Sequence, residues 1–219
     1  TCTHPQWIPN FRGLGPLGKG RDASGGGARY YNLSIDGAVL AVVADSFASL
    51  AQRIESEGKL TWEEIVANIR SNYSGQRCLY IRSLLKNSQR YGQANSEGER
   101  WAVRVKDAFV GYVRRESDDK MGHVFIPGFF SWANTVVFGN HVKATPDGRM
   151  AGTPISHGAN PSPGFSVEDA SLSLAVAIAK IQPGFGNTAP MQLELDPTLA
   201  SEDNAELVGA IIRAHFELG

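Results

Sequence analysis

The sequence has few cysteines and no excess of either charge, and each shortage excludes a class of protein. Its 219 residues include two cysteines, too few for a disulfide framework or a four-thiolate zinc site. The 21 basic side chains against 22 acidic ones give no electrostatic reason to expect a nucleic-acid or membrane-surface partner. No apolar run approaches the roughly 20 residues of a membrane span, and the first residues lack the basic and apolar regions of a signal peptide. We therefore expect a cytoplasmic protein with no nucleic-acid and no membrane partner.

Local catalytic motifs are equally scarce. Residues 13–18 match the pattern G-x-G-x-x-G of dinucleotide sites, but Pro16 removes a backbone amide and no strand is predicted before it. The five histidines have no second His or Cys at ligand spacing, so a metal site has no local support. His123 and His141 flank a strand-rich region and could meet in space, but structural or surface roles suit them better.

Hydrophobic periodicity predicts helices interleaved with short strands, which indicates an α/β or α+β protein. We expect helices over residues 36–57, from 61 onward, 77–85, 97–115, 167–181 and 203–218, and strands over 29–34, 123–126, 133–138 and 191–195. Thr61 and Glu64 have the spacing of a capping box, so Glu63 and Glu64 are expected to stabilise a helix start rather than act as catalytic carboxylates. The inward face of the 97–115 helix is predicted to carry Trp101, Val105, Ala108, Phe109 and Tyr112.

We expect one partial domain over residues 1–219, with an irregular glycine- and proline-rich lead-in over residues 1–29. Residues 141–164 form a predicted loop that is too long for a plain connector, and such loops usually have a function or contact a partner. Its polar side chains could build a hydrogen-bond scaffold or bind a small anion; they are Lys143, Asp147, Arg149, His157 and Asn160.

The same loop carries a family resemblance. Residues 144–154, ATPDGRMAGTP, and residues 158–161, GANP, resemble a signature of the glycyl radical enzymes, the family of pyruvate formate-lyase and the diol, choline and hydroxyproline lyases. Three further stretches agree in order and spacing: residues 20–30 (GRDASGGGARY), 43–46 (VADS, resembling a helix start) and 134–139 (NTVVFG). The signature loop comprises Thr145, Pro146, Asp147, Gly148, Arg149, Gly152, Pro154, Gly158, Asn160 and Pro161.

The resemblance implies part of a ten-stranded α/β barrel with long Gly/Pro-rich loops. In such enzymes a glycyl radical passes its spin to a cysteine, and an activating enzyme with S-adenosylmethionine and an iron–sulfur cluster installs the radical. The chain would then be a segment or subunit of a glycyl radical lyase that cleaves C–C or C–X bonds of a small-molecule substrate, as formate acetyltransferases or dehydratases do. A homo-oligomer is expected, and no cofactor or metal is expected to bind this chain directly.

The family's two catalytic residues are not identified in this sequence. Gly111 lies in a run, FVGY, that resembles the radical segment, but it precedes the Pro-Asp-Gly-Arg loop, whereas the radical loop follows it. Cys2 does not match the thiyl-cysteine motif, and Cys78 has the spacing of a core residue. We therefore expect the radical Gly and the thiyl Cys outside this chain, on the remaining part of the enzyme or on a partner subunit. The alternative is a truncated, catalytically inactive relative that serves as a binding or structural module.

A substrate cavity is suggested near the end of the sequence. Residues 187–197 resemble a late barrel strand, so Met191, Leu193 and Glu194 are expected to line the cavity. Many relatives carry a basic residue near the position of Glu194. Because this sequence has a glutamate there, the resemblance implies that anionic substrates, which would need the basic residue for binding, are disfavoured. A barrel segment of this kind should also expose sheet edges and apolar surface.

Overall fold

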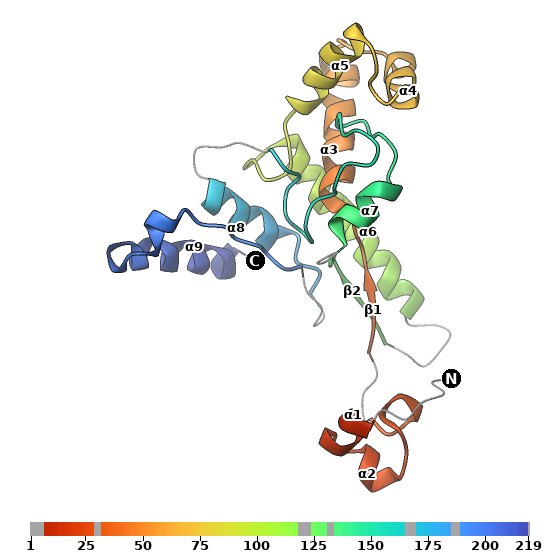
Figure 1. Cartoon of the computed structure of the whole chain (residues 1–219), viewed down its shortest axis with the longest axis vertical. Coiled ribbons are helices and arrows are strands. Elements are labelled where there is room, and N and C mark those ends of the chain that lie inside the picture. The colour runs from red at the N-terminus through yellow and green to blue at the C-terminus, as the bar shows by residue number, and fades with distance from the viewer. Residues whose placement is uncertain are drawn as a thin grey trace.

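The fold is organised around two parallel strands and the helices that extend from them (Figure 1). The computed structural model describes residues 7–28, 32–117, 124–130, 134–164, 170–184 and 189–218. Its elements are α1 (Trp7–Arg12), α2 (Pro16–Lys19), a 3-10 turn (Ala23–Gly25), β1 (Asn32–Asp36), α3 (Leu40–Leu50), a π-helical segment (Ala51–Ser56), α4 (Trp62–Arg70), α5 (Gln76–Lys86), α6 (Glu97–Ser117), β2 (Val124–Gly128), α7 (Thr135–His141), α8 (Ala170–Lys180), 3-10 turns (Pro197–Ala200 and Glu202–Asn204) and α9 (Ala205–Leu218).

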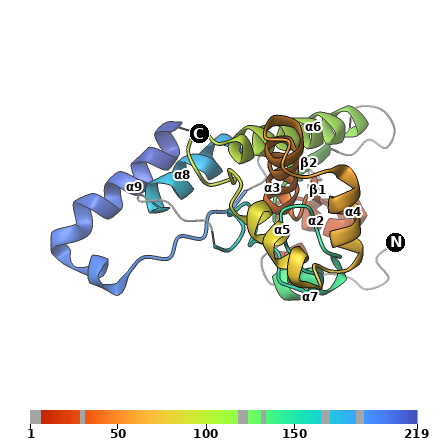
Figure 2. The same ribbon diagram turned by 90° about the horizontal axis from the view of Figure 1, so that it is seen from above.

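Strands β1 and β2 pair in parallel, from Asn32 opposite Val124 to Asp36 opposite Gly128. A parallel pair needs a long crossover, and here it contains α3 to α6. Helix α3 packs along α6, and α6 also packs against β2. Figure 1 shows α1 and α2 beyond one end of the strands and α4 and α5 at the opposite end, and both Figures 1 and 2 show α8 and α9 projecting to one side.

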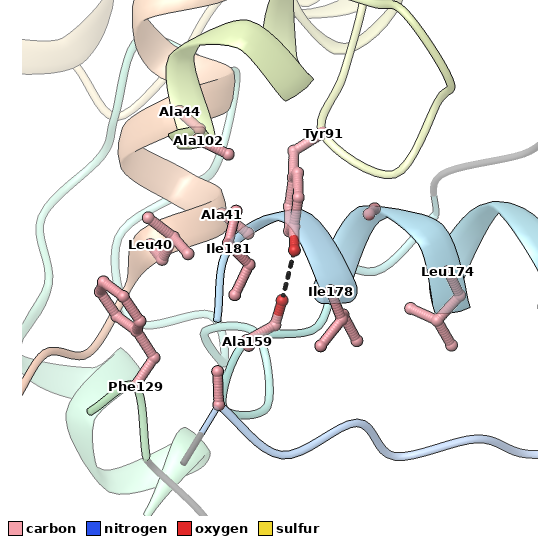
Figure 3. Close-up of a cluster of buried hydrophobic side chains, with 12 residues drawn as sticks. Leu40, Ala41, Ala44, Tyr91, Ala102, Phe129, Ala159, Leu174, Ile178 and Ile181 are labelled. Atoms are coloured by element: carbon pink, nitrogen blue, oxygen red, sulfur yellow. Dashed lines mark hydrogen bonds between the residues drawn. The ribbon is translucent and has the colours of Figure 1, made fainter. Parts of the chain in front are cut away.

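The first hydrophobic core lies where α3, α6 and α8 meet the loop after α7 (Figure 3). Tyr91 is fully buried there, and its hydroxyl donates a hydrogen bond of 2.9 Å to the carbonyl oxygen of Ala159. The residues packed around it include Leu40, Ala41, Ala44, Ala102, Phe129, Leu174, Ile178 and Ile181. This core therefore fixes the end of the 141–164 loop against three helices.

A second core joins α4 and α5 to the beginning of the same loop. Its buried members are Leu60, Ile65, Tyr73, Ile81, Leu85 and Ala144. Cys78 packs against this cluster as a partly buried side chain, as the prediction of a core role requires. The capping box is also confirmed, because Thr61 Oγ1 accepts from the amide of Glu64 and the Glu64 carboxylate accepts from the amide of Thr61.

Several predicted boundaries are wrong for identifiable reasons. The helix predicted over residues 36–57 begins at Leu40, because β1 continues to Asp36 and the amide of Gly37 donates to Gly128. Val39 then has a φ of 69°, which is outside helical geometry. The VADS motif therefore lies inside α3 and not at a helix start. Residues 1–29 were expected to be irregular, but α1 and α2 occupy part of them.

Two predicted strands are not strands. Residues 133–138 were expected to be extended, whereas Thr135–His141 is the helix α7. Residues 191–195 pair with no strand among the described ranges. On α6, Ala108 and Tyr112 are exposed rather than inward, with Tyr112 58% exposed; Ala102 and Val113 are buried instead.

Apolar side chains are exposed on β1 and α7, as expected for a segment of a larger barrel. They include Leu33, Ile35, Val136, Val137 and Phe138. Among the helices of the described ranges, none is long and apolar enough to span a membrane. The same ranges contain no group of three or more His, Cys, Asp or Glu side chains that could hold a metal ion. His123, one of the two histidines considered for a shared site, lies outside the described residues.

Candidate functional site

Arg149 organises the long loop from within. Its side chain is 7% exposed, and its guanidinium donates to four backbone carbonyls. Three of these acceptors are Val142 at 3.3 Å, Lys143 at 3.1 Å and Gly139 at 2.9 Å, and the fourth is Thr153. The donors of a guanidinium form a rigid planar fork. One side chain therefore joins the end of α7 to the loop segments on both sides of the Pro-Asp-Gly-Arg turn. The sequence suggested that the polar side chains of the loop either build a hydrogen-bond scaffold or bind a small anion, and Arg149 belongs to a hydrogen-bond scaffold.

The Pro-Asp-Gly-Arg sequence forms a tight turn that presses against α5. The amide of Gly148 donates to Thr145 at 3.1 Å, and Asp147 Oδ1 accepts from the Thr145 hydroxyl at 2.5 Å. Gly148 has a φ of 81°, and a Cβ at this position would lie 2.9 Å from Cγ of Lys86. Glycine is therefore required at this position both for its backbone conformation and for the close approach to α5.

A buried ionic cluster, formed by Asp45, Arg90 and Asp147, adjoins this turn. Arg90 donates to Asp45 Oδ2 through Nε at 3.1 Å and Nη2 at 3.0 Å, and Asp45 Oδ1 accepts from the amide of Tyr91 at 2.7 Å. Asp147 approaches the same guanidinium at 4.0 Å. Burial raises the pKa of Asp45 to about 6, because desolvation outweighs the opposing effects of Arg90 and of the Tyr91 amide.

At its other end the loop forms a pocket with the segment before α9. A cavity of about 450 Å³ is lined by Ser156, His157, Asn160, Pro161, Pro163, Ala170, Ser171, Leu174, Gln192, Leu193 and Glu194. The Asn160 amide makes two reciprocal bonds to Gln192, donating to its carbonyl at 2.8 Å and accepting from its amide at 3.1 Å. The side chain of Asn160 thus holds the backbone of Gln192 beside the signature loop.

The structure distributes the predicted site residues over several places. Asn160, Pro161, Leu193 and Glu194 come together at the pocket. Met191 is not among the lining residues and packs against the first core. Gly158 lies against Phe129 and Pro190, beside the first core. The remaining residues of the signature loop lie in or near the scaffold held by Arg149: Thr145, Pro146, Asp147, Gly148, Arg149, Gly152 and Pro154.

Sequence reasoning missed Arg82, Lys86 and Arg90, which face the turn. Arg82 Nε donates to the carbonyl of Gly148 at 2.9 Å. Their spacing of four residues places Arg82 and Lys86 on one face of α5, which was a usable signal. Arg90 follows the helix, and its pairing with Asp45 across 45 residues of sequence had no local signal.

Comparison with known proteins identifies the fold and the family. Residues 15–139, more than half of the chain, match the family described as "Pyruvate formate lyase-like". The chain belongs to the pyruvate formate lyase-like family. Isethionate sulfite-lyase of Oleidesulfovibrio alaskensis is 26% identical, over 80% of this chain and 21% of that protein. (2S)-3-sulfopropanediol dehydratase of Klebsiella oxytoca is 30% identical, over 65% of this chain and 17% of that protein.

A solved structure agrees with this assignment. The crystal structure of a glycyl radical enzyme from Archaeoglobus fulgidus superposes with a TM-score of 0.85 at 26% identity, covering 98% of this chain and 27% of that one. The fold is therefore part of the α/β barrel of glycyl radical enzymes. The chain spans about a fifth of the length of the curated relatives named above.

Neither Cys78 nor Gly111 is among the residues that line the pocket. Cys78 lies on α5 beside the second core. Gly111 lies in the middle of α6, on its exposed face, as expected from the sequence. Cys2 is outside the described residues. No step of a reaction is therefore assigned to a radical on these residues.

Proposed function

We propose that this chain is a segment of a glycyl radical lyase or dehydratase, with the radical Gly and the thiyl Cys outside it. The observation that carries the proposal is the pocket in which Asn160 and Pro161 of the signature loop meet Leu193 and Glu194. The role of the segment is then to bind and orient part of a small-molecule substrate. An activating enzyme with S-adenosylmethionine and an iron–sulfur cluster would install the radical, in a cytoplasmic homo-oligomer.

The charge of the pocket favours a neutral or cationic substrate over an anionic one. Glu194 contributes a carboxylate, and Gln192 Nε2 donates to it at 3.0 Å. No Lys or Arg is among the residues that line the cavity. A carboxylate repels a sulfonate or carboxylate group of a ligand, so a hydroxylated substrate without a negative charge suits the lining best.

The radical itself can be tested directly. The natural polypeptide that contains residues 1–219 is incubated under anaerobic conditions with the activating enzyme and S-adenosylmethionine. We expect a glycyl radical signal by electron paramagnetic resonance, followed by turnover of a neutral diol or polyol. No radical signal, under conditions that activate a known glycyl radical dehydratase, contradicts the proposal and favours an inactive relative.

The role of Glu194 predicts a change in ligand charge preference. In Glu194→Gln the lining loses its negative charge while the shape of the side chain is kept. Because the repulsion at a partly solvated site is of the order of 1 kcal/mol, inhibition by a small alkanesulfonate should strengthen about fivefold. Glu202→Gln is the matched control, because Glu202 is exposed and does not line the pocket. Equal inhibition constants for both variants would contradict the assigned lining.

A further inference from the structure

A separate, strongly basic cavity lies between α5 and the turn of the signature loop. It has a volume of about 290 Å³ and is lined by Val42, Arg82, Lys86, Arg90, Asp147, Arg149, Met150, Thr153, Pro154, Ser156, Ser162 and Pro163. The lining therefore holds four cationic side chains against a single carboxylate, that of Asp147. Its residues overlap with those of the first pocket only at Ser156 and Pro163.

Two of the four cations have internal partners. Arg90 is paired with Asp45, and Arg149 binds four carbonyls through its terminal nitrogens. Asp147 is likewise engaged, because its Oδ1 accepts from the Thr145 hydroxyl and the Arg149 amide. The lining thus has an excess of positive charge at Arg82 and Lys86, which the single carboxylate among the lining residues, that of Asp147, offsets only in part.

Lys86 and Arg82 lie beside one another at the cavity, where Lys86 is exposed and Arg82 is half-buried. They lie four residues apart on one face of α5, where like charges destabilise a helix. Within the described ranges, Lys86 Nζ has no hydrogen-bond or ion-pair partner, and Arg82 uses only Nε, toward Gly148. Burial lowers the pKa of Lys86, and the nearby guanidinium groups of Arg82 and Arg90 lower it further, against the opposing effect of the Asp147 carboxylate.

Two residues that line the cavity carry a buried donor without a partner among the described residues. The Ser162 hydroxyl lines the cavity, is on a residue 5% exposed, and has no hydrogen-bond partner among the described residues. The same is true of Nε of Arg149, on a side chain that is also buried. A buried polar group without a partner costs free energy, which a bound acceptor would recover.

We propose that this cavity binds a phosphate group, either inorganic phosphate or the phosphate of a small monoester. The tetrahedral oxygens of phosphate can accept from Lys86 and Arg82 on α5 and from Ser162 in the signature loop, whereas a carboxylate offers two oxygens in one plane. A neighbouring hollow shares Arg82, Lys86 and Arg90 with this cavity. The site is distinct from the proposed substrate pocket and does not depend on radical chemistry.

Calorimetric titration of the natural polypeptide with inorganic phosphate, at constant ionic strength, tests the proposal. We expect saturable binding of one phosphate, weakened about tenfold in Lys86→Gln because a charge-assisted hydrogen bond is lost. The matched control is Arg77→Gln, which removes a positive charge from the same helix but outside the cavity, where Arg77 pairs with Glu64. Its phosphate affinity should stay within about twofold of the parent value.

Ser162→Ala separates binding from folding. Removing a buried hydroxyl without a partner should leave the unfolding midpoint of the phosphate-free protein unchanged or raise it, and weaken phosphate binding about threefold. A parallel titration with glycerol phosphate distinguishes a monoester, which would bind more tightly than inorganic phosphate, from the inorganic ion. The proposal is overturned if neither compound binds saturably, or if Lys86→Gln and Arg77→Gln weaken binding equally.

Discussion

Arg149→Ala should destabilise the segment by about 3–5 kcal/mol, the largest effect expected for a single substitution in the loop. The substitution leaves the carbonyls of Gly139, Val142, Lys143 and Thr153 without their shared donor, and the bond to Gly139 is buried while the other three are partly buried. The loss should be visible as faster amide hydrogen exchange in residues 139–154 of the natural polypeptide, together with a lower midpoint of urea unfolding.

Two variants distinguish the scaffold from a simple charge effect. Arg149→Lys keeps the positive charge but cannot reach four carbonyls with a single ammonium group, so it should recover little of the stability. Arg70→Ala removes an exposed guanidinium at the end of α4 and should change the midpoint very little. An Arg149→Ala protein as stable as Arg70→Ala would rule out the scaffold.

The sequence was a good guide where local chemistry decides the structure. The capping box at Thr61 and Glu64 fixed the start of α4, and the apolar period of residues 97–115 matched α6 to within two residues at its end. The signature loop was also assigned correctly as a long irregular segment, because its glycines and prolines prevent regular structure.

The errors occur where distant residues decide the structure. Residues 133–138 contain Val136, Val137 and Phe138, which favour a strand by intrinsic propensity. In the fold they lie in α7, whose carbonyl at Gly139 is bound by Arg149 and whose close approach to Thr153 leaves no room for a Cβ at Gly139. Neither contact can be read from a local pattern, because Arg149 and Thr153 lie in the following loop.

The candidate site shows the same division. The residue types of the loop suggested either a scaffold or an anion site, and the fold separates the two roles. Arg149 is committed to backbone carbonyls, while the unbalanced charge comes from Arg82 and Lys86 of α5, more than 60 residues earlier. The pocket at Asn160 is predicted in part: the resemblance of residues 187–197 to a barrel strand indicates Leu193 and Glu194 as lining residues.

The buried pair of Arg90 and Asp45 gives the second large effect. Arg90→Met keeps the length of the side chain but leaves the Asp45 carboxylate, which is 1% exposed, without its cation. Removing one partner of a buried pair typically costs about 3–5 kcal/mol, so the variant should be strongly destabilised at neutral pH. In Asp45→Asn/Arg90→Met both charges are gone, and part of this loss should be recovered.

The pH dependence of this loss identifies Asp45 as its cause. In the parent protein the pKa of Asp45 is raised to about 6, above its ordinary value of 3.8, so its contribution to stability is fully present below the lower value and declines as pH rises through the higher one. Because Arg90 lowers this pKa, its removal raises the pKa further and extends the decline toward neutral pH. Unfolding midpoints measured from about pH 5 to about pH 8 should therefore fall more steeply with pH in Arg90→Met than in the parent, and the double variant should lose this slope. Parallel curves for the parent and Arg90→Met would mean that Asp45 is not the group that Arg90 stabilises.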